Sequence, residues 1–193
     1  MFLVAIYLFF INRYEVVRVG KYIYKVEKNN DEIKKKESVD TLVKVRLRLL
    51  SLVELMLKTF PTDPKIARMQ KRFADTVFQE ANPEMELSKH GKEGMIITKA
   101  GKPSTSYTIN KGDVMVLCIR NTNGDLVDMN TLMYVAIHEL AHILSSSLDH
   151  TTEFWDNMKL LIDYAIKNKI YIKRDYTNQP VPYCGITIDS NIN

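Results

Sequence analysis

Two histidines four residues apart, with a glutamate directly after the first, form the pattern His138-Glu139-x-x-His142. On a helix, positions i and i+4 lie on one face, so both imidazoles can point toward a single metal ion. Zinc, at about 2.0 to 2.1 Å from each nitrogen, fits this gap. Glu139 projects beside the metal, where a carboxylate can accept a proton from bound water. The pattern therefore predicts hydrolysis through a zinc-activated water, with His138 and His142 as ligands and Glu139 as general base.

A third ligand is expected downstream, because a catalytic zinc has three protein ligands and one open position. Three of the four histidines of the chain lie between residues 138 and 150, and the third of these is His150. The serines at 145 to 147 and Asp149 suit a turn that brings His150 back to the site. Glu153 is the alternative ligand. His150 is preferred because imidazole suits zinc at least as well as carboxylate, and because His150 comes before Glu153 in the chain after the turn.

The same residues also fit sites without catalysis. Two partly buried histidines can bond to the backbone or to each other, with Glu139 as a surface charge. A structural zinc would need a fourth ligand, and neither cysteine lies near the motif in sequence, although Cys184 could approach it in space. Cys118 and Cys184 are too few for a disulfide framework, so we expect two reduced, buried thiols.

The elements around the motif follow from periodicity and capping residues. The apolar run 114–119, followed by an Asn123-Gly124 turn, predicts a strand that leads to the motif helix. Asp128 or Asn130 can cap that helix, and another helix is expected over 151–169. The tail from residue 170 has two prolines and no helical period, so we expect extended chain that wraps over the body.

Two further helices are predicted upstream. Ser38 is the expected N-cap of the first, which ends at Phe60. Asp63 and Pro64 begin the second, which should continue to Ala81. The polar side of the pair is basic, and we expect it to be solvated, with acidic lipid or nucleic acid as alternative partners. Its cations are Arg46, Arg48, Lys65, Arg68, Lys71 and Arg72.

The remaining segments are short strands and charged or flexible chain. Alternation over 14–28 predicts one or two short strands, and the charged stretch 29–37 predicts a solvated linker. Glycine, lysine and serine dominate 88–112, where a short strand is expected at Met95 to Thr98. The chain therefore divides into an N-terminal segment (1–17), short strands with a linker (18–37) and a main domain (38–193).

The first eleven residues, MFLVAIYLFFI, are uninterruptedly apolar. As a helix they would span only about 16 Å, and an extension through Tyr14, Val16 and Val17 would give about 25 Å. We favour a membrane anchor over a buried, β-rich strand, and the lysines and arginines that follow would then leave the domain on the cytosolic side. A soluble cytoplasmic protein is the alternative. The segment has no small-residue cleavage site, so a removable secretory signal is not expected.

Length and composition predict one folded domain. The chain has 193 residues, of which 46% are hydrophobic and 26% charged, as in globular proteins. The formal net charge of +4 is spread over local runs, which is weak evidence for nucleic-acid binding.

The stretch NTLMYVAIHELAHILSSSLDHTTEFWDNMKLLI (130–162) resembles the WLM group of zincin-type metallopeptidases, relatives of the Wss1 and SprT-like proteases. It is most similar to short forms from large DNA viruses, in which we also expect a hydrophobic N-terminus and a YCG sequence, here at 183–185. The resemblance implies a zincin-like α+β fold: a small mixed or antiparallel sheet packed on helices that include the HExxH helix. It implies zinc bound by His138, His142 and His150, with Glu139 as base.

The resemblance also implies cleavage of protein or peptide substrates, which in some relatives are crosslinked to DNA. The basic tails that direct those relatives to DNA are not visible here. Many relatives have five residues, including a glycine, between the second and third histidines, whereas this chain has seven and no glycine. The alternative function is a catalytically inactive zinc-binding module, or a membrane-anchored module for protein or DNA contact.

Two further expectations follow from this resemblance. The strand 114–119 could lie at the sheet edge and pair with an extended substrate, although its continuous apolar character also fits an internal strand. Tyr176 and Tyr183 are candidate donors to the oxyanion of the reaction, and both equally suit a packing role.

Overall fold

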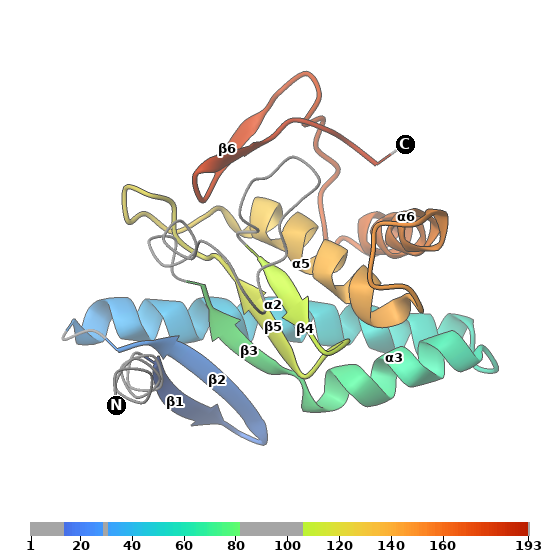
Figure 1. Ribbon diagram of the computed structural model, residues 1–193, viewed down its shortest axis with the longest axis horizontal. Coiled ribbons are helices and arrows are strands. Elements are labelled where there is room, and N and C mark those ends of the chain that lie inside the picture. The colour runs from blue at the N-terminus through green and yellow to red at the C-terminus, as the bar shows by residue number, and fades with distance from the viewer. Residues whose placement is uncertain (1–13, 29–30, 82–105, 193) are drawn as a thin grey trace, which may run out of the picture.

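The computed structural model describes residues 14–28, 31–81 and 106–192 (Figure 1). Four helices and a mixed sheet make up the main body, so the predicted α+β class is confirmed. The described elements, in chain order, are β1 (Tyr14–Val19), β2 (Tyr22–Glu27), α2 (Glu32–Thr59), α3 (Pro64–Asp75), β3 (Val77–Glu80), β4 (Tyr107–Ile109), β5 (Val114–Leu117), α5 (Met129–Leu144), α6 (Thr152–Lys167), β6 (Val181–Tyr183) and β7 (Ile186–Ile188).

The main sheet has five strands in the order β1-β2-β3-β5-β4. Strands β2, β3 and β5 run parallel, whereas β1 and β4 pair antiparallel with their neighbours. The predicted strand before the motif helix is β5, and it lies between β3 and β4. The interpretation of this run as a substrate-pairing edge is therefore wrong. Among the described strands, β4 is at that edge.

Both upstream helices differ from their predicted limits. Helix α2 begins at Glu32, because the Asp31 side chain accepts hydrogen bonds from the Ile33 and Lys34 backbone amides. Ser38, the predicted N-cap, lies inside the helix, and its hydroxyl donates to Glu80 at 3.0 Å. Much of the expected linker is thus helical.

Helix α3 starts as predicted, with Asp63 as N-cap and Pro64 in the first turn, but it ends at Asp75 rather than Ala81. Residues 77–80 form β3 instead, which pairs with β5 over four residues. Phe78 of this strand is fully buried. Its place between two parallel neighbours outweighs the helical periodicity that continues past Asp75.

Arg46 is fully buried, although the sequence suggests a place on the basic polar face of α2. Its guanidinium lies over the rings of Tyr22 at 4.5 Å and Phe78 at 4.1 Å, and it donates to the Thr76 carbonyl. Aromatic faces attract a cation, which partly compensates for its burial. Arg46 therefore belongs to the core and not to the expected basic face.

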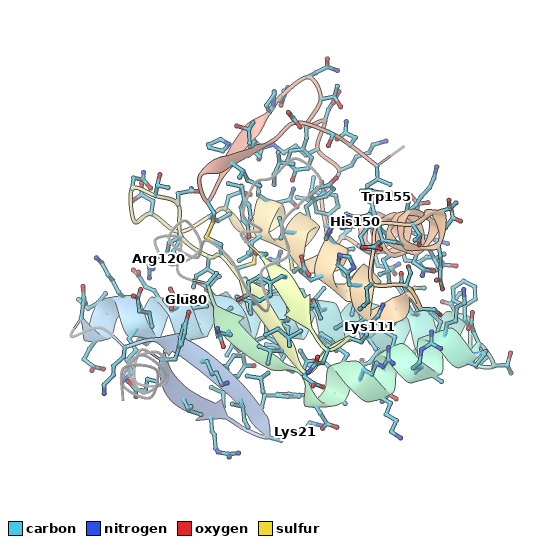
Figure 2. All side chains as sticks on the ribbon, in the orientation of Figure 1. Lys21, Glu80, Lys111, Arg120, His150 and Trp155 are labelled. Carbon is cyan, nitrogen blue, oxygen red and sulfur yellow. A yellow bond between two sulfur atoms is a disulfide. The ribbon has the colours of Figure 1, made fainter. Side chains whose placement is uncertain are left out.

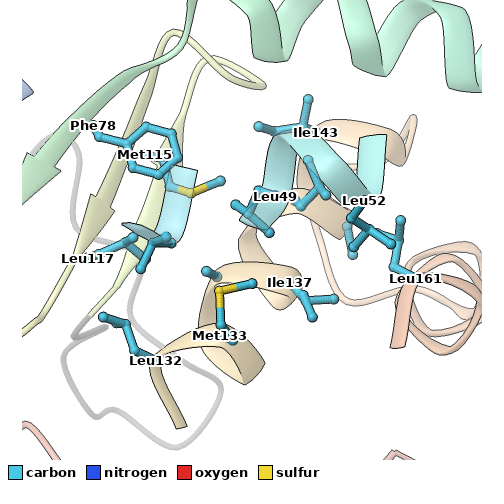
Figure 3. Close-up of a cluster of buried hydrophobic side chains, with 14 of the residues drawn as sticks. Leu49, Leu52, Phe78, Met115, Leu117, Leu132, Met133, Ile137, Ile143 and Leu161 are labelled. Atoms are coloured by element: carbon cyan, nitrogen blue, oxygen red, sulfur yellow. The ribbon is translucent and has the colours of Figure 1, made fainter. Parts of the chain in front are cut away.

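The core lies between the sheet and helices α2 and α5 (Figure 3). Helix α2 contacts β2, β3, α3, α5 and α6, so its buried face links the sheet to the other helices. Helix α5 in turn packs against α6, α2, α3 and β4. The motif helix is consequently held on several sides. The labelled core residues are Leu49, Leu52, Phe78, Met115, Leu117, Leu132, Met133, Ile137, Ile143 and Leu161.

The N-terminal expectation is tested only in part, because residues 1–13 lie outside the described residues. Tyr14–Val19 forms strand β1, so a helical extension through Val17 is wrong. Across 14–28, 31–81 and 106–192, no helix has both the length and the apolar character needed to cross a membrane. The strand expected at Met95 to Thr98 also lies outside the described residues.

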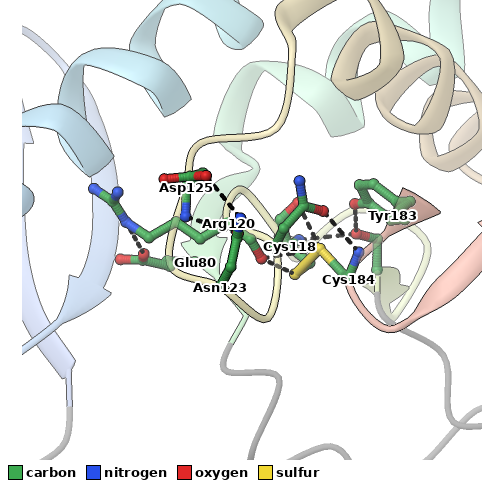
Figure 4. The surroundings of a disulfide bond; sticks show 9 residues. Glu80, Cys118, Arg120, Asn123, Asp125, Tyr183 and Cys184 are labelled. Carbon is green, nitrogen blue, oxygen red and sulfur yellow. Dashed lines mark hydrogen bonds and ion pairs between the residues drawn. A yellow bond between two sulfur atoms is a disulfide. The ribbon is translucent and has the colours of Figure 1, made fainter. Parts of the chain in front are cut away.

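Cys118 and Cys184 form a disulfide, so the prediction of two reduced thiols is wrong (Figure 4). The pairing joins residues 66 positions apart, and the turn between β6 and β7 brings Cys184 to the end of β5. Next to this bond, the Tyr183 and Ser106 hydroxyls are 2.6 Å apart, and the Cys184 amide donates to Asn121. The predicted extended tail is present, and its hairpin is fixed to the main sheet.

Candidate metal centre

Helix α5 places the first two histidines on one face, as the spacing predicts. Asp128 caps the helix by accepting from the Asn130 and Thr131 amides. The helix continues to Leu144, so His138 and His142 both lie within regular helix, and their ring centroids are 5.1 Å apart. Both imidazoles are partly buried. Their relative position is therefore fixed by backbone geometry and by the packing of α5.

The loop after α5 returns His150 to the same point. The Nε2 atoms of His150 and His138 are 2.9 Å apart, and the ring centroid of His150 is 4.8 Å from that of His142. Ligand atoms of all three histidines lie within 4.8 Å of one another. Nitrogens around a tetrahedral zinc stand roughly 3.3 Å apart. The three side chains thus form a donor set that fits zinc.

Phe154 and Trp155, at the start of α6, surround this cluster. The Phe154 ring centroid lies 4.4 to 4.8 Å from all three imidazoles. Trp155 stacks on His150 at 5.4 Å and remains 43% exposed. Apolar groups around a metal site restrict water access and hold the ligand rings in place. The residues after the third histidine therefore contribute to the site.

Burial keeps the histidines in the form that binds metals. Desolvation, together with the neighbouring His142 and His150, lowers the pKa of His138 well below its ordinary value. The pKa of His142 falls to about 3, again chiefly through burial. Metal ligation needs the neutral imidazole. Both side chains are consequently ready to bind a cation at neutral pH without first losing a proton.

Glu139 lies on the buried side of α5, with 3% of its surface exposed. Its Oε2 accepts a hydrogen bond from the Thr108 hydroxyl of β4 at 3.0 Å. Burial raises the pKa of Glu139 to about 8, and the bond from Thr108 acts in the opposite direction. A carboxyl group with a pKa near neutrality suits proton transfer. The interpretation of Glu139 as a solvated surface charge does not fit this environment.

Glu153 and the two tail tyrosines occupy other positions. Glu153 pairs with Lys65 at 3.2 Å and accepts from the Ser146 amide, so its carboxylate is engaged away from the histidines. The Tyr183 hydroxyl is buried against Ser106. Tyr176 is fully buried, with its ring centroid 4.7 Å from that of Tyr134. The packing alternative therefore describes both tyrosines better than a role as exposed oxyanion donors.

Cys184 is excluded as a fourth thiolate ligand in this structure because its sulfur is bonded to Cys118. Thr108, by contrast, touches the candidate base and was not found from the sequence. It lies in a segment rich in loop-forming residues, and only the antiparallel pairing of β4 with β5 brings it beside α5. No local pattern marks such a contact.

Residues 106–179 match the family model of the WLM domain. This part of the chain is similar to WLM domains. This WLM region contains β4, β5, α5 and α6, and with them every residue of the candidate site described above. The predicted resemblance is confirmed over these residues.

Proteins of large DNA viruses are also similar to part of this chain. Uncharacterized protein R325 of Acanthamoeba polyphaga mimivirus is 40% identical over 89 residues, which are 46% of this chain and 45% of that protein. Uncharacterized protein 042R of Invertebrate iridescent virus 3 is 43% identical over 70 residues, which are 36% of this chain and 43% of that protein. The matched segment thus spans less than half the length of these relatives.

A crystal structure of a Wss1 mutant from Saccharomyces cerevisiae is also similar to this chain. The alignment has a TM-score of 0.48 and 16% identity, and it covers 75% of this chain and 90% of that chain.

Proposed function

We propose that this chain is a zinc-dependent peptidase with His138, His142 and His150 as ligands and Glu139 as general base. The observation that carries the proposal is the convergence of three imidazoles beside a buried carboxyl group. A purely structural or incidental histidine cluster has no need for such a group. The WLM region that contains the site supports the same chemistry.

Zinc bound by the three histidines would lower the pKa of a coordinated water and polarise the substrate carbonyl. Glu139 then accepts the proton of the attacking water at its carboxylate and delivers it to the leaving amine. Thr108 holds the carboxylate in place for both transfers through its bond to Oε2. Phe154 keeps water away from the inner side of the ligands.

A protein or peptide substrate fits the surroundings of the site. Strand β4 carries Thr108 and is the outermost described strand on this side of the sheet, so an extended peptide can add to it and reach Glu139. Beside His150, Leu148 is 78% exposed and Trp155 is 43% exposed. These two side chains offer apolar contact to a substrate residue near the scissile bond.

A zinc-binding module without catalysis is the alternative, and one substitution separates the two. Glu139→Gln keeps the side-chain size and the three ligands but removes the base. We expect it to retain zinc and to cleave a mixture of unstructured peptides at least about 100-fold more slowly than wild type. Glu54→Gln, which changes an exposed glutamate of α2, is the matched control and should cleave normally.

Cleavage is measured by mass spectrometry of the peptide mixture, and zinc is measured on the same samples. Glu139→Gln with wild-type activity would exclude Glu139 as the base. A wild-type protein that holds zinc but cleaves no peptide under any condition would favour the non-catalytic module.

A further inference from the structure

The segment 146–152, which carries His150, has no hydrophobic anchor. None of its seven side chains is buried, and Leu148, its only large apolar residue, is 78% exposed. Burial fixes the flanking positions instead, at Ser145 and at Phe154. Fixing a loop residue in one conformation carries an entropic cost that some contact must offset. The position of His150 therefore depends on the contacts of its ring with Phe154 and Trp155 and on polar contacts to the loop backbone.

Lys111 supplies two of these contacts from the turn between β4 and β5. Its Nζ donates to the Ser145 carbonyl at 3.1 Å and also to the Ser147 carbonyl. The ammonium group thus bridges the end of α5 and the first part of the loop. Cations are favourable at a helix C-terminus, where backbone carbonyls lack intrahelical partners.

Arg68 and Glu153 hold the same loop from other sides. The Arg68 guanidinium, from α3, donates to the Leu144 carbonyl at 3.3 Å and to the Ser146 hydroxyl at 3.4 Å. Glu153 accepts from the Ser146 amide at 3.2 Å. Lys111 nevertheless makes the contact at Ser147, which lies nearest to His150 among the residues held in this way.

The backbone at Lys111 is also unusual. Asn110 and Lys111 have φ angles of 48° and 58°, in the left-handed region. Asparagine tolerates this conformation, whereas a lysine there is uncommon, and tight hairpin turns favour glycine at such a position. A strained backbone position is a reason to look for a use of the side chain it carries. Here, the side chain reaches the loop that carries His150.

We propose that Lys111 is a positioning residue for His150, which it holds at the metal centre by bridging the carbonyls of Ser145 and Ser147. Figure 2 shows Lys111 below His150 in the same part of the molecule. In this role Lys111 acts on His150 through the loop, although its positive charge also lies close enough to His142 to contribute to the lowered pKa of that imidazole. The inference rests on the proposed zinc site and assigns to it a residue outside the HExxH motif.

The test compares zinc affinity in full-length variants by competition with a chromogenic chelator. Lys111→Met removes the donors at similar length, and we expect it to weaken zinc binding 10- to 100-fold, as loss of supporting contacts around ligands does. Lys111→Arg keeps the charge and donors and should recover most of the affinity. Lys71→Met removes an exposed lysine of α3 and should bind zinc like wild type.

Two further readouts separate positioning from a general loss of stability. The unfolding midpoint in chelator should be similar for Lys111→Met and Lys71→Met. The visible spectrum of the cobalt-substituted Lys111→Met protein should differ from that of wild type, because His150 is displaced. If Lys111→Met does not fold, Arg68→Met tests the same loop and should also weaken zinc binding.

Wild-type zinc affinity and an unchanged cobalt spectrum in Lys111→Met would overturn the inference while leaving the proposed function intact. If Lys71→Met loses as much affinity as Lys111→Met, the effect is one of overall charge and the inference also fails. A folded wild-type chain that binds no zinc would overturn both proposals together.

Discussion

At the scale of single residues, the Thr108 hydroxyl influences the pKa of Glu139, the candidate general base. It donates to Glu139 Oε2 at 3.0 Å inside a buried site. This bond favours the ionised carboxylate, while burial favours the protonated acid and raises the pKa of Glu139 to about 8. A general base acts in its ionised form. The balance between the two effects therefore sets the pH below which the activity falls.

Thr108→Val should therefore move the acid limb of the pH-rate profile to higher pH. Loss of the hydrogen bond raises the pKa of Glu139 further, so less of the base is ionised at any pH below that pKa. A bond to a charged group is worth about 1.5 kcal/mol or more, so activity near neutral pH should fall about 10-fold. Thr122→Val, at an exposed position in the loop after Cys118, is the control and should leave the profile unchanged. An acid limb at the wild-type pH in Thr108→Val would exclude this role.

The sequence reveals the residues of the site that share a helix, because spacing alone determines their common face. It also indicates His150, since the loop between His142 and His150 has turn-forming residues. Thr108 and Lys111 are different, because they reach the site through the pairing of β4 with β5. Contacts of this kind depend on tertiary structure, and no periodic pattern in the sequence predicts them.

At the scale of elements, the tail hairpin of β6 and β7 is joined to the main sheet by a disulfide. Cys118 follows β5 and Cys184 lies in the hairpin turn, so the bond closes a long stretch of chain that includes α5 and α6. Further contacts tie the tail to α5: Asn130 donates to the Ile172 carbonyl, and the Tyr134 hydroxyl donates to the Ser190 carbonyl. The closed stretch thus contains the three histidines and Glu139.

Cys184→Ser should lower the free energy of unfolding by about 2 to 4 kcal/mol, because the closed loop restricts the unfolded chain. The measurement is denaturant unfolding of both proteins, with and without a dithiol reductant. Reductant should bring wild type toward the variant and leave the variant unchanged. Two free thiols in wild type, detected by alkylation after unfolding without reductant, would contradict the pairing.

Local sequence signals identify some element limits and fail at others. The caps at Asp63 and Asp128 are where the sequence predicts them, because capping is a contact between near neighbours. The end of α3 is not, because residues 77–80 are recruited into the sheet by strands that are distant in sequence. The cysteine pairing could not be found for the same reason, since it depends on a hairpin 66 residues from Cys118.

At the scale of the whole molecule, the candidate site joins parts that meet only in the folded chain. Helix α5 supplies two histidines and Glu139, the following loop supplies His150, and β4 supplies Thr108. A metal bound by these groups would connect α5 to the loop and stabilise the folded state over the unfolded chain. Composition and length predict a folded domain, but they do not predict this arrangement.

Zinc content is the measurement that tests the central claim most directly. The full-length protein and His138→Ala are purified, desalted and analysed for metal by mass spectrometry, with circular dichroism to establish that both are folded. We expect close to one zinc per wild-type chain and almost none in His138→Ala. A folded wild-type protein without zinc, even after incubation with excess zinc and removal of the unbound ion, would contradict the proposed metal centre and the function built on it.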